Sequence, residues 1–181
     1  MIDRIWTRHA GMVALCFGAL GALIYVLMIT VTLAQIETIS GRVPFDLRPL
    51  GYSPQDAALL LEGLGVEGRN YYLSHQIPLD TAYPALLALT LISLMRWCAQ
   101  DAPTQTLVWV GIILAIAAAL CDYAENLGIV VMILRWPDLS ALIVHASSVA
   151  TVAKSMLTTA AVIITVLIGV IAAKRRVRPT S

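Results

Sequence analysis

Four long apolar segments, nearly free of charged residues, limit the fold of this chain more than any other feature. They cover about 10–34, 80–97, 104–125 and 154–173 of the 181 residues. A hydrocarbon layer of about 30 Å takes roughly 20 residues of helix, so each segment is long enough to cross a bilayer. We therefore predict an all-α integral membrane protein, a bundle of four transmembrane helices in a single membrane domain over 1–181.

The composition excludes several other classes of protein. Charged residues make up 13% of the chain, and the mean hydropathy is +0.83. Soluble domains carry about 25% charged residues, so an ordinary water-soluble fold is excluded. The net charge of +1 attracts no polyanion, and we expect the lipid bilayer, not nucleic acid, as the main surroundings. Cys16, Cys98 and Cys121 form no CxxC pair, so we expect free thiols packed as small apolar groups.

The basic residues predict the orientation in the membrane. The first segment exceeds the roughly 7–15-residue core of a signal peptide, so we expect a permanent span, with a cleavable signal ending near 32–34 as the alternative. One side of the predicted bundle holds Arg4, Arg8, Arg96, Lys174, Arg175, Arg176 and Arg178. The other holds Arg42, Arg48, Arg69 and Arg135. This bias predicts that both termini are cytoplasmic, in a bacterial inner membrane, with the inverted topology as the alternative.

The regions 37–77 and 126–153 are predicted to form a helical cap on the outer, non-cytoplasmic face. Ser53 followed by Pro54 and Asp56 is typical of a helix start, and Gly65 of its end. We expect this short amphipathic helix over 54–64. A second short helix is expected from Glu67 towards His75, stopped by Pro78.

The third and fourth apolar helices continue beyond the length that a bilayer needs. Their extensions, 127–134 and 140–153, are expected to form a hairpin. Because apolar side chains there avoid water, we predict that the helix over 54–64 packs on them. A kinked or re-entrant arrangement at Gly128 is the alternative.

Four ionisable residues are predicted to lie at one depth. With a rise of 1.5 Å per residue, Asp80 lies roughly 24 Å from Arg96 along its helix, and Asp122 roughly 27 Å from Thr104. Lys154 lies roughly 30 Å from Lys174. Glu125 lies one helical turn beyond Asp122, so all four residues reach the outer edge of the hydrocarbon. Ionisable groups at this depth are costly unless they are paired, and they are functional candidates by default.

These residues and their neighbours give the candidate site. The candidate catalytic residues are Asp122, Glu125, Lys154 and Asp80. The candidate ligand-binding residues are Asp122, Glu125, Asn126, Lys154, Thr151, Ser155, His75 and Tyr83. Helical spacing puts Asp122, Glu125 and Asn126 on one face of their helix. Lys154 is expected to pair with Asp122 or Glu125. The structural alternatives are an N-cap role for Asp80, an ion pair that only holds the bundle together, and a capping or solvated His75.

Two classes of function fit this pattern. The first is a small membrane protein that binds a hydrophobic or lipid-like ligand, or that acts as a non-enzymatic accessory or assembly subunit for another membrane protein or a second copy. The alternative is a membrane-embedded enzyme in which a Lys-paired acid stays ionised while its neighbour takes up a proton from a lipid-like or isoprenoid substrate. The Glu–His pairs of di-iron bundles are absent, so we expect neither a metal nor a cofactor.

Overall fold

The computed structural model describes the backbone of residues 2–101 and 104–177, and the side chains of 9–100 and 104–175. This part of the chain is all-helical, with about 90% of residues in helices and no strand. The elements in order are α1 (Ile2–Leu27), η1 (Met28–Thr32), α2 (Leu33–Ser40), η2 (Phe45–Leu47), α3 (Pro54–Tyr71), η3 (Tyr72–Gln76), α4 (Ile77–Cys98), η4 (Ala99–Asp101), α5 (Gln105–Arg135) and α6 (Ala141–Val177). Within these described residues, four helices are long and apolar enough to span a membrane.

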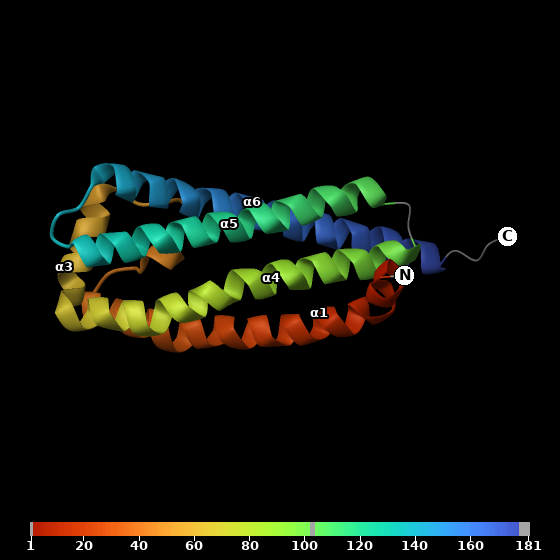
Figure 1. Cartoon of the computed structure of the whole chain (residues 1–181), viewed down its shortest axis with the longest axis horizontal. Coiled ribbons are helices and arrows are strands. Elements are labelled where there is room, and N and C mark those ends of the chain that lie inside the picture. The colour runs from red at the N-terminus through yellow and green to blue at the C-terminus, as the bar shows by residue number, and fades with distance from the viewer. Residues whose placement is uncertain (1, 102–103, 178–181) are drawn as a thin grey trace.

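The long helices lie side by side, with the start of α1 and the end of α6 at one end of the bundle and α3 at the other (Figure 1). α1 packs on α4, α4 on α5, and α5 on α6 along the most extensive contact of the bundle. Between α1 and α6 the described residues make at most a marginal contact. α1 and α6 are therefore held next to each other through their contacts with α4, not by packing on each other. We call the gap between α1 and α6 the seam of the bundle.

α3 packs across the end of the bundle through its apolar face, and the residues at its start fix where the helix begins. The Ser53 side chain accepts from the Asp56 backbone N–H, and the Asp56 carboxylate accepts from the Ser53 backbone N–H. The apolar face predicted for this helix is buried, and it shares one core with the far ends of α5 and α6. That core includes Leu60, Leu61 and Leu64 from α3, with Ile129 from α5 and Val144 from α6, among others.

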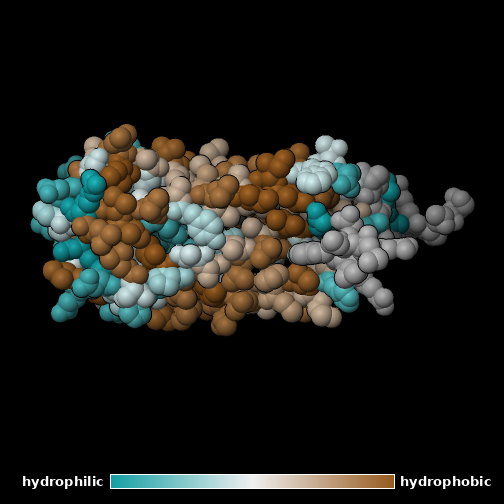
Figure 2. Space-filling view, viewed as in Figure 1, coloured by the Kyte–Doolittle hydropathy of each residue, from teal (hydrophilic) through white to brown (hydrophobic). Residues whose placement is uncertain are grey.

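The hairpin of α5 and α6 keeps a second apolar face that α3 does not cover. Leu127, Leu134, Leu142 and Val149 are each more than 60% exposed. On the face drawn in Figure 2, hydrophobic surface dominates the middle of the bundle, while hydrophilic residues gather around the α3 end and in smaller groups towards the opposite end. A single helix can bury only the side of the hairpin that faces it. The predicted packing of 54–64 on the hairpin therefore accounts for only part of its apolar surface.

Three local expectations are wrong. Pro78 does not stop the helix after Glu67, because the π-helical turn η3 continues directly into α4, of which Pro78 is the second residue. Asp80 is not an N-cap, since Gln76 occupies that position. α5 also runs without a break across Gly128, so the kinked alternative does not occur. Gly65, in contrast, has a φ of 59° and breaks the helical geometry of α3 as expected.

The first span also extends further than predicted. η1 and α2 continue α1 to Ser40, and Gly41 ends the rod with a φ of 63°, the left-handed geometry that glycine adopts without strain. Among the basic residues used for orientation, Arg4, Arg8, Arg176 and Arg178 lie outside the residues whose side chains are described.

The close approach of α5 and α6 depends on Gly128. A Cβ atom at this position would lie 2.6 Å from the Cβ and the Oγ of Ser147. We predict that Gly128→Ala lowers the free energy of unfolding by about 1–3 kcal/mol, the usual range for overpacking a tight contact. At Gly169 the nearest atom, Cys98 Sγ, would be 3.9 Å away, so Gly169→Ala is the matched control. Thermal unfolding in detergent measures both, and an equal melting temperature for the two variants would contradict the prediction.

Candidate functional site

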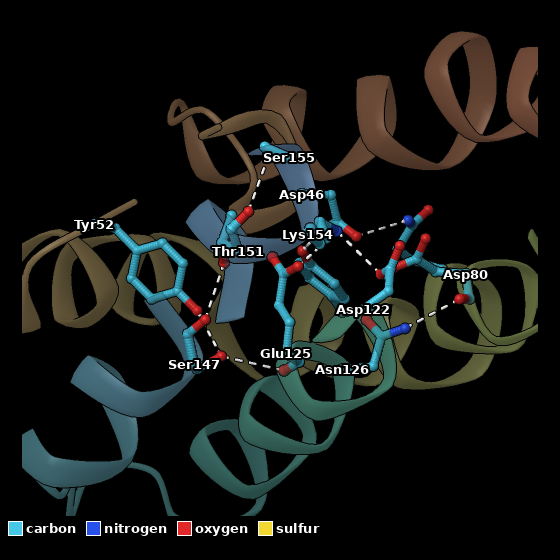
Figure 3. Close-up of polar contacts among 12 residues, drawn as sticks. Asp46, Tyr52, Asp80, Asp122, Glu125, Asn126, Ser147, Thr151, Lys154 and Ser155 are labelled. Carbon is cyan, nitrogen blue, oxygen red and sulfur yellow. Dashed lines mark hydrogen bonds and ion pairs between the residues drawn. The ribbon is translucent and has the colours of Figure 1, made fainter. Parts of the chain in front are cut away.

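Lys154 on α6 contacts both acidic residues of α5 that the sequence offered as alternatives. Its Nζ donates to Asp122 Oδ1 at 3.0 Å and lies 2.5 Å from Glu125 Oε2 (Figure 3). The Glu125 contact is an ion pair by distance only, because neither carboxylate oxygen accepts a well-directed hydrogen bond from the described residues. The side chains of Lys154 and Asp122 are 14% and 13% exposed, and that of Glu125 is fully buried. The pair therefore joins α5 to α6 inside the protein.

Asp80 brings a third carboxyl group to this region from α4. The residue is 2% exposed, and its Oδ2 has no hydrogen-bond partner among the described residues. Asp122, Lys154 and Asp46 are close enough to Asp80 to interact with it electrostatically. Asn126 Nδ2 donates to the Asp80 backbone oxygen at 3.0 Å, so the amide ties α5 to α4 instead of extending the set of charges.

Asp46, which sequence analysis missed, adds a fourth carboxyl group from η2. It accepts hydrogen bonds from the Tyr72 hydroxyl and, at 3.1 Å, from Gln76 Nε2. The Gln76 side-chain oxygen in turn accepts from Thr32 Oγ1 at 2.5 Å. In the sequence, Asp46 is marked only by its place next to Phe45, and the structure shows that Phe45 is completely buried. We refer to Asp46, Asp80, Asp122, Glu125 and Lys154 together as the charge cluster.

Tyr52 links the loop before α3 to both helices of the hairpin. Its hydroxyl donates to Ser147 Oγ at 2.7 Å, and the Ser147 hydroxyl donates to the Glu125 backbone oxygen at 3.1 Å (Figure 3). Its backbone N–H donates to Ser148 Oγ at 2.8 Å. Burial, with the Glu125 carboxylate nearby, raises the pKa of Tyr52 to about 12. The phenol therefore stays protonated at neutral pH and remains a donor.

The remaining predicted ligand residues divide into two groups. Thr151 and Ser155 lie beside Lys154 on α6, and their hydroxyls donate to the backbone oxygens four residues earlier, Ser147 O and Thr151 O. Tyr83 also reaches the region, where its ring lies 5.5 Å from that of Tyr25 between centroids. His75 does not, because its imidazole is stacked on Tyr71 at the exposed side of η3 and contacts Ser74.

A cavity of about 340 Å³ lies beside the charge cluster, within the roughly 300–1,000 Å³ of small-molecule sites. We call it the lateral cavity, because the two helices on either side of it, α1 and α6, hardly touch. Among the residues that line this cavity, Tyr25 is 48% exposed and Asp80 is only 2% exposed. Its lining is Tyr25, Met28, Ile29, Leu33, Asp46, Leu47, Asp80, Tyr83, Leu87, Asp122, Lys154, Ser155, Thr158 and Thr159. The cavity thus combines apolar walls with charged groups at depth.

The charge cluster holds four carboxyl groups and one ammonium group. The single positive charge of Lys154 cannot balance even the two acids that it contacts. The remaining negative charge must be neutralised by protons, hydrogen-bond donors or a further cation. No group of three or more His, Cys, Asp and Glu side chains has metal-binding geometry in the described part of the chain. The arrangement can therefore bind a polar, donor-rich group, or hold a proton, at the inner wall of an apolar cavity.

Comparisons of the chain with protein-family models, with curated proteins and with solved structures gave no match. The function of the charge cluster is therefore inferred from its geometry and chemistry.

The Lys154 ion pairs should dominate local stability. Removing one partner of a buried pair leaves the other charge uncompensated, which typically costs about 3–5 kcal/mol. We predict that Lys154→Met lowers the free energy of unfolding by about 3 kcal/mol, because two carboxylates lose their cation. Lys174→Met, at an exposed position on the same helix, should change it by less than about 0.5 kcal/mol. Unfolding in mixed micelles by added SDS measures both, and similar losses in the two variants would refute an ion-pair role.

Proposed function

We propose that the chain is an integral membrane protein whose four long helices cross the bilayer, with both termini cytoplasmic and α3 capping the outer face. The exposed large apolar residues of α1 and η1 run from Met12 to Val31, roughly 29 Å of helix, which matches a hydrocarbon core of about 30 Å. Tyr25, which lines the lateral cavity, lies near the end of this stretch. The charge cluster would then lie at the outer edge of the hydrocarbon, beneath α3.

We further propose that the protein binds an amphiphilic, lipid-like ligand in the lateral cavity. The observation that carries this proposal is a cavity between two barely touching helices whose walls are apolar and whose inner end holds Asp80, Asp122 and Lys154. In a bilayer, such a seam opens towards the acyl chains instead of towards water. A ligand that enters sideways would keep its chain against Met28, Ile29 and other apolar residues, and its head group against the charges.

An accessory or assembly role is the second candidate, and a different surface favours it. The uncovered face of the hairpin carries Leu127, Leu134, Leu142 and Val149, which need either lipid or another protein against them. Under this alternative the charge cluster only fixes the register of the bundle. An enzymatic role requires in addition that Asp80, whose Oδ2 is unpartnered, moves a proton to or from the bound molecule.

The topology can be tested with single cysteines. The background for this test lacks Cys16, Cys98 and Cys121. We predict that Glu62→Cys on α3 reacts with a membrane-impermeant maleimide in intact cells, because the Glu62 side chain is exposed and α3 is proposed to lie outside the membrane on the outer face. Lys174→Cys, at the other end of the bundle, should react only after the cells are permeabilised. Labelling of both positions in intact cells, or the reverse pattern, would overturn the proposed orientation.

Ligand occupancy can be tested by filling the lateral cavity. Thr158 lines it, so Thr158→Phe should expel a bound lipid-like molecule, and we expect the co-purified mass to fall at least tenfold. Met156, on the same helix, is 69% exposed and does not line the cavity, so Met156→Phe is the matched control. Native mass spectrometry of protein extracted in polymer-bounded lipid discs measures the bound mass. No bound mass in the wild type, or equal mass in both variants, would favour the accessory role.

A further inference from the structure

Building on the proposed ligand-binding function, we infer that the lateral cavity selects an organic cation: an ammonium head group carried on an apolar body. The inference depends on which carboxyl groups already have a cation. Lys154 contacts Asp122 and Glu125, so its charge is committed to α5. Asp46 and Asp80 have no basic side chain in ion-pair contact within the described residues.

Asp46 and Asp80 differ in what they accept. Asp46 receives two neutral donors, the Tyr72 hydroxyl and Gln76 Nε2. Asp80 Oδ2 receives none, although the residue is almost completely buried. The nearest loop cation by sequence, Arg48, has other partners: it contacts Asp56 at 3.5 Å and donates to the Val43 backbone oxygen.

The unpartnered oxygen and the cavity coincide, because Asp80 and Asp46 both belong to its lining. A buried carboxylate oxygen without a donor costs free energy, which a positively charged donor placed in the cavity would recover. An ammonium group is such a donor, and it can point one N–H towards each carboxyl group. A phosphate head group would face two uncompensated acids instead.

Aromatic rings at the same cavity favour an organic cation over a metal ion. Tyr25 and Tyr83 both line it, with ring centroids 5.5 Å apart and planes inclined by 30°. Ring faces attract ammonium groups, and the effect grows where water is excluded. The apolar wall formed by Ile29, Leu33 and Leu87 suits the body of an amphiphile. A metal ion would use neither feature.

The test measures binding of radiolabelled dodecylammonium to the full chain in phosphatidylcholine nanodiscs, with empty nanodiscs as background. Dodecanol and dodecanoate serve as neutral and anionic probes of the same chain length. We expect saturable binding of one dodecylammonium per chain, at least tenfold tighter than dodecanol. Asp80→Asn should weaken dodecylammonium at least tenfold and leave dodecanol unchanged. Glu62→Gln, an exposed acid on α3, should match the wild type.

Asp80→Asn removes a buried charge without changing side-chain volume, so it should fold, which its melting temperature checks. Asp46→Asn provides a second variant with the same expected loss. Equal affinity for dodecanol and dodecylammonium would overturn the cation preference but leave amphiphile binding intact. No saturable binding of any probe would overturn both. A melting temperature raised by Na⁺ or Mg²⁺ alone through Asp80, without amine binding, would assign the site to an inorganic cation and overturn the proposal.

Discussion

The ion pair between Lys154 and the two acids of α5 is the interaction on which the other features of the site depend. It joins the two helices with the largest mutual contact at a level where Asp122 and Glu125 would otherwise repel each other. Burial of three charged groups is unfavourable unless they satisfy one another. Once α5 and α6 are fixed in this register, Gly128 can lie against Ser147, and Ser147 can accept from Tyr52. The loop before α3 is thereby tied to the hairpin.

The same pairing leaves the α4 side of the charge cluster without a cation. Asp80 faces Asp46 and Asp122 beside the lateral cavity, and α1 does not close the seam against α6. A protein that served only as a rigid bundle would gain stability by filling this cavity with apolar side chains. An open seam next to an unpartnered acid instead suits a protein that exchanges a molecule with the surrounding lipid, which is why we favour binding over a purely structural role.

Much of this arrangement could be predicted from the sequence, because helix rise is constant. Counting residues along three apolar segments predicts that Asp80, Asp122 and Lys154 lie at one level of the bundle, and the three residues do lie together. The contribution of Asp46 could not be predicted, since the path of a loop depends on tertiary contacts such as those of Tyr72. Pro78 was misleading for a related reason: proline is unfavourable inside a helix, yet the chain stays helical through Pro78 and through Pro84 in the interior of α4, which only the structure shows.

The most direct measurement of the central claim is a double-mutant cycle between α5 and α6. The free energy of unfolding would be compared for the wild type, Lys154→Met, Glu125→Gln and the double variant. Because each single change removes one partner of a buried pair, we expect a coupling energy of about 1.5–3 kcal/mol, with the double variant more stable than the sum of the single losses implies. Additive losses, with no coupling beyond error, would mean that Lys154 does not hold this acid and would contradict the account.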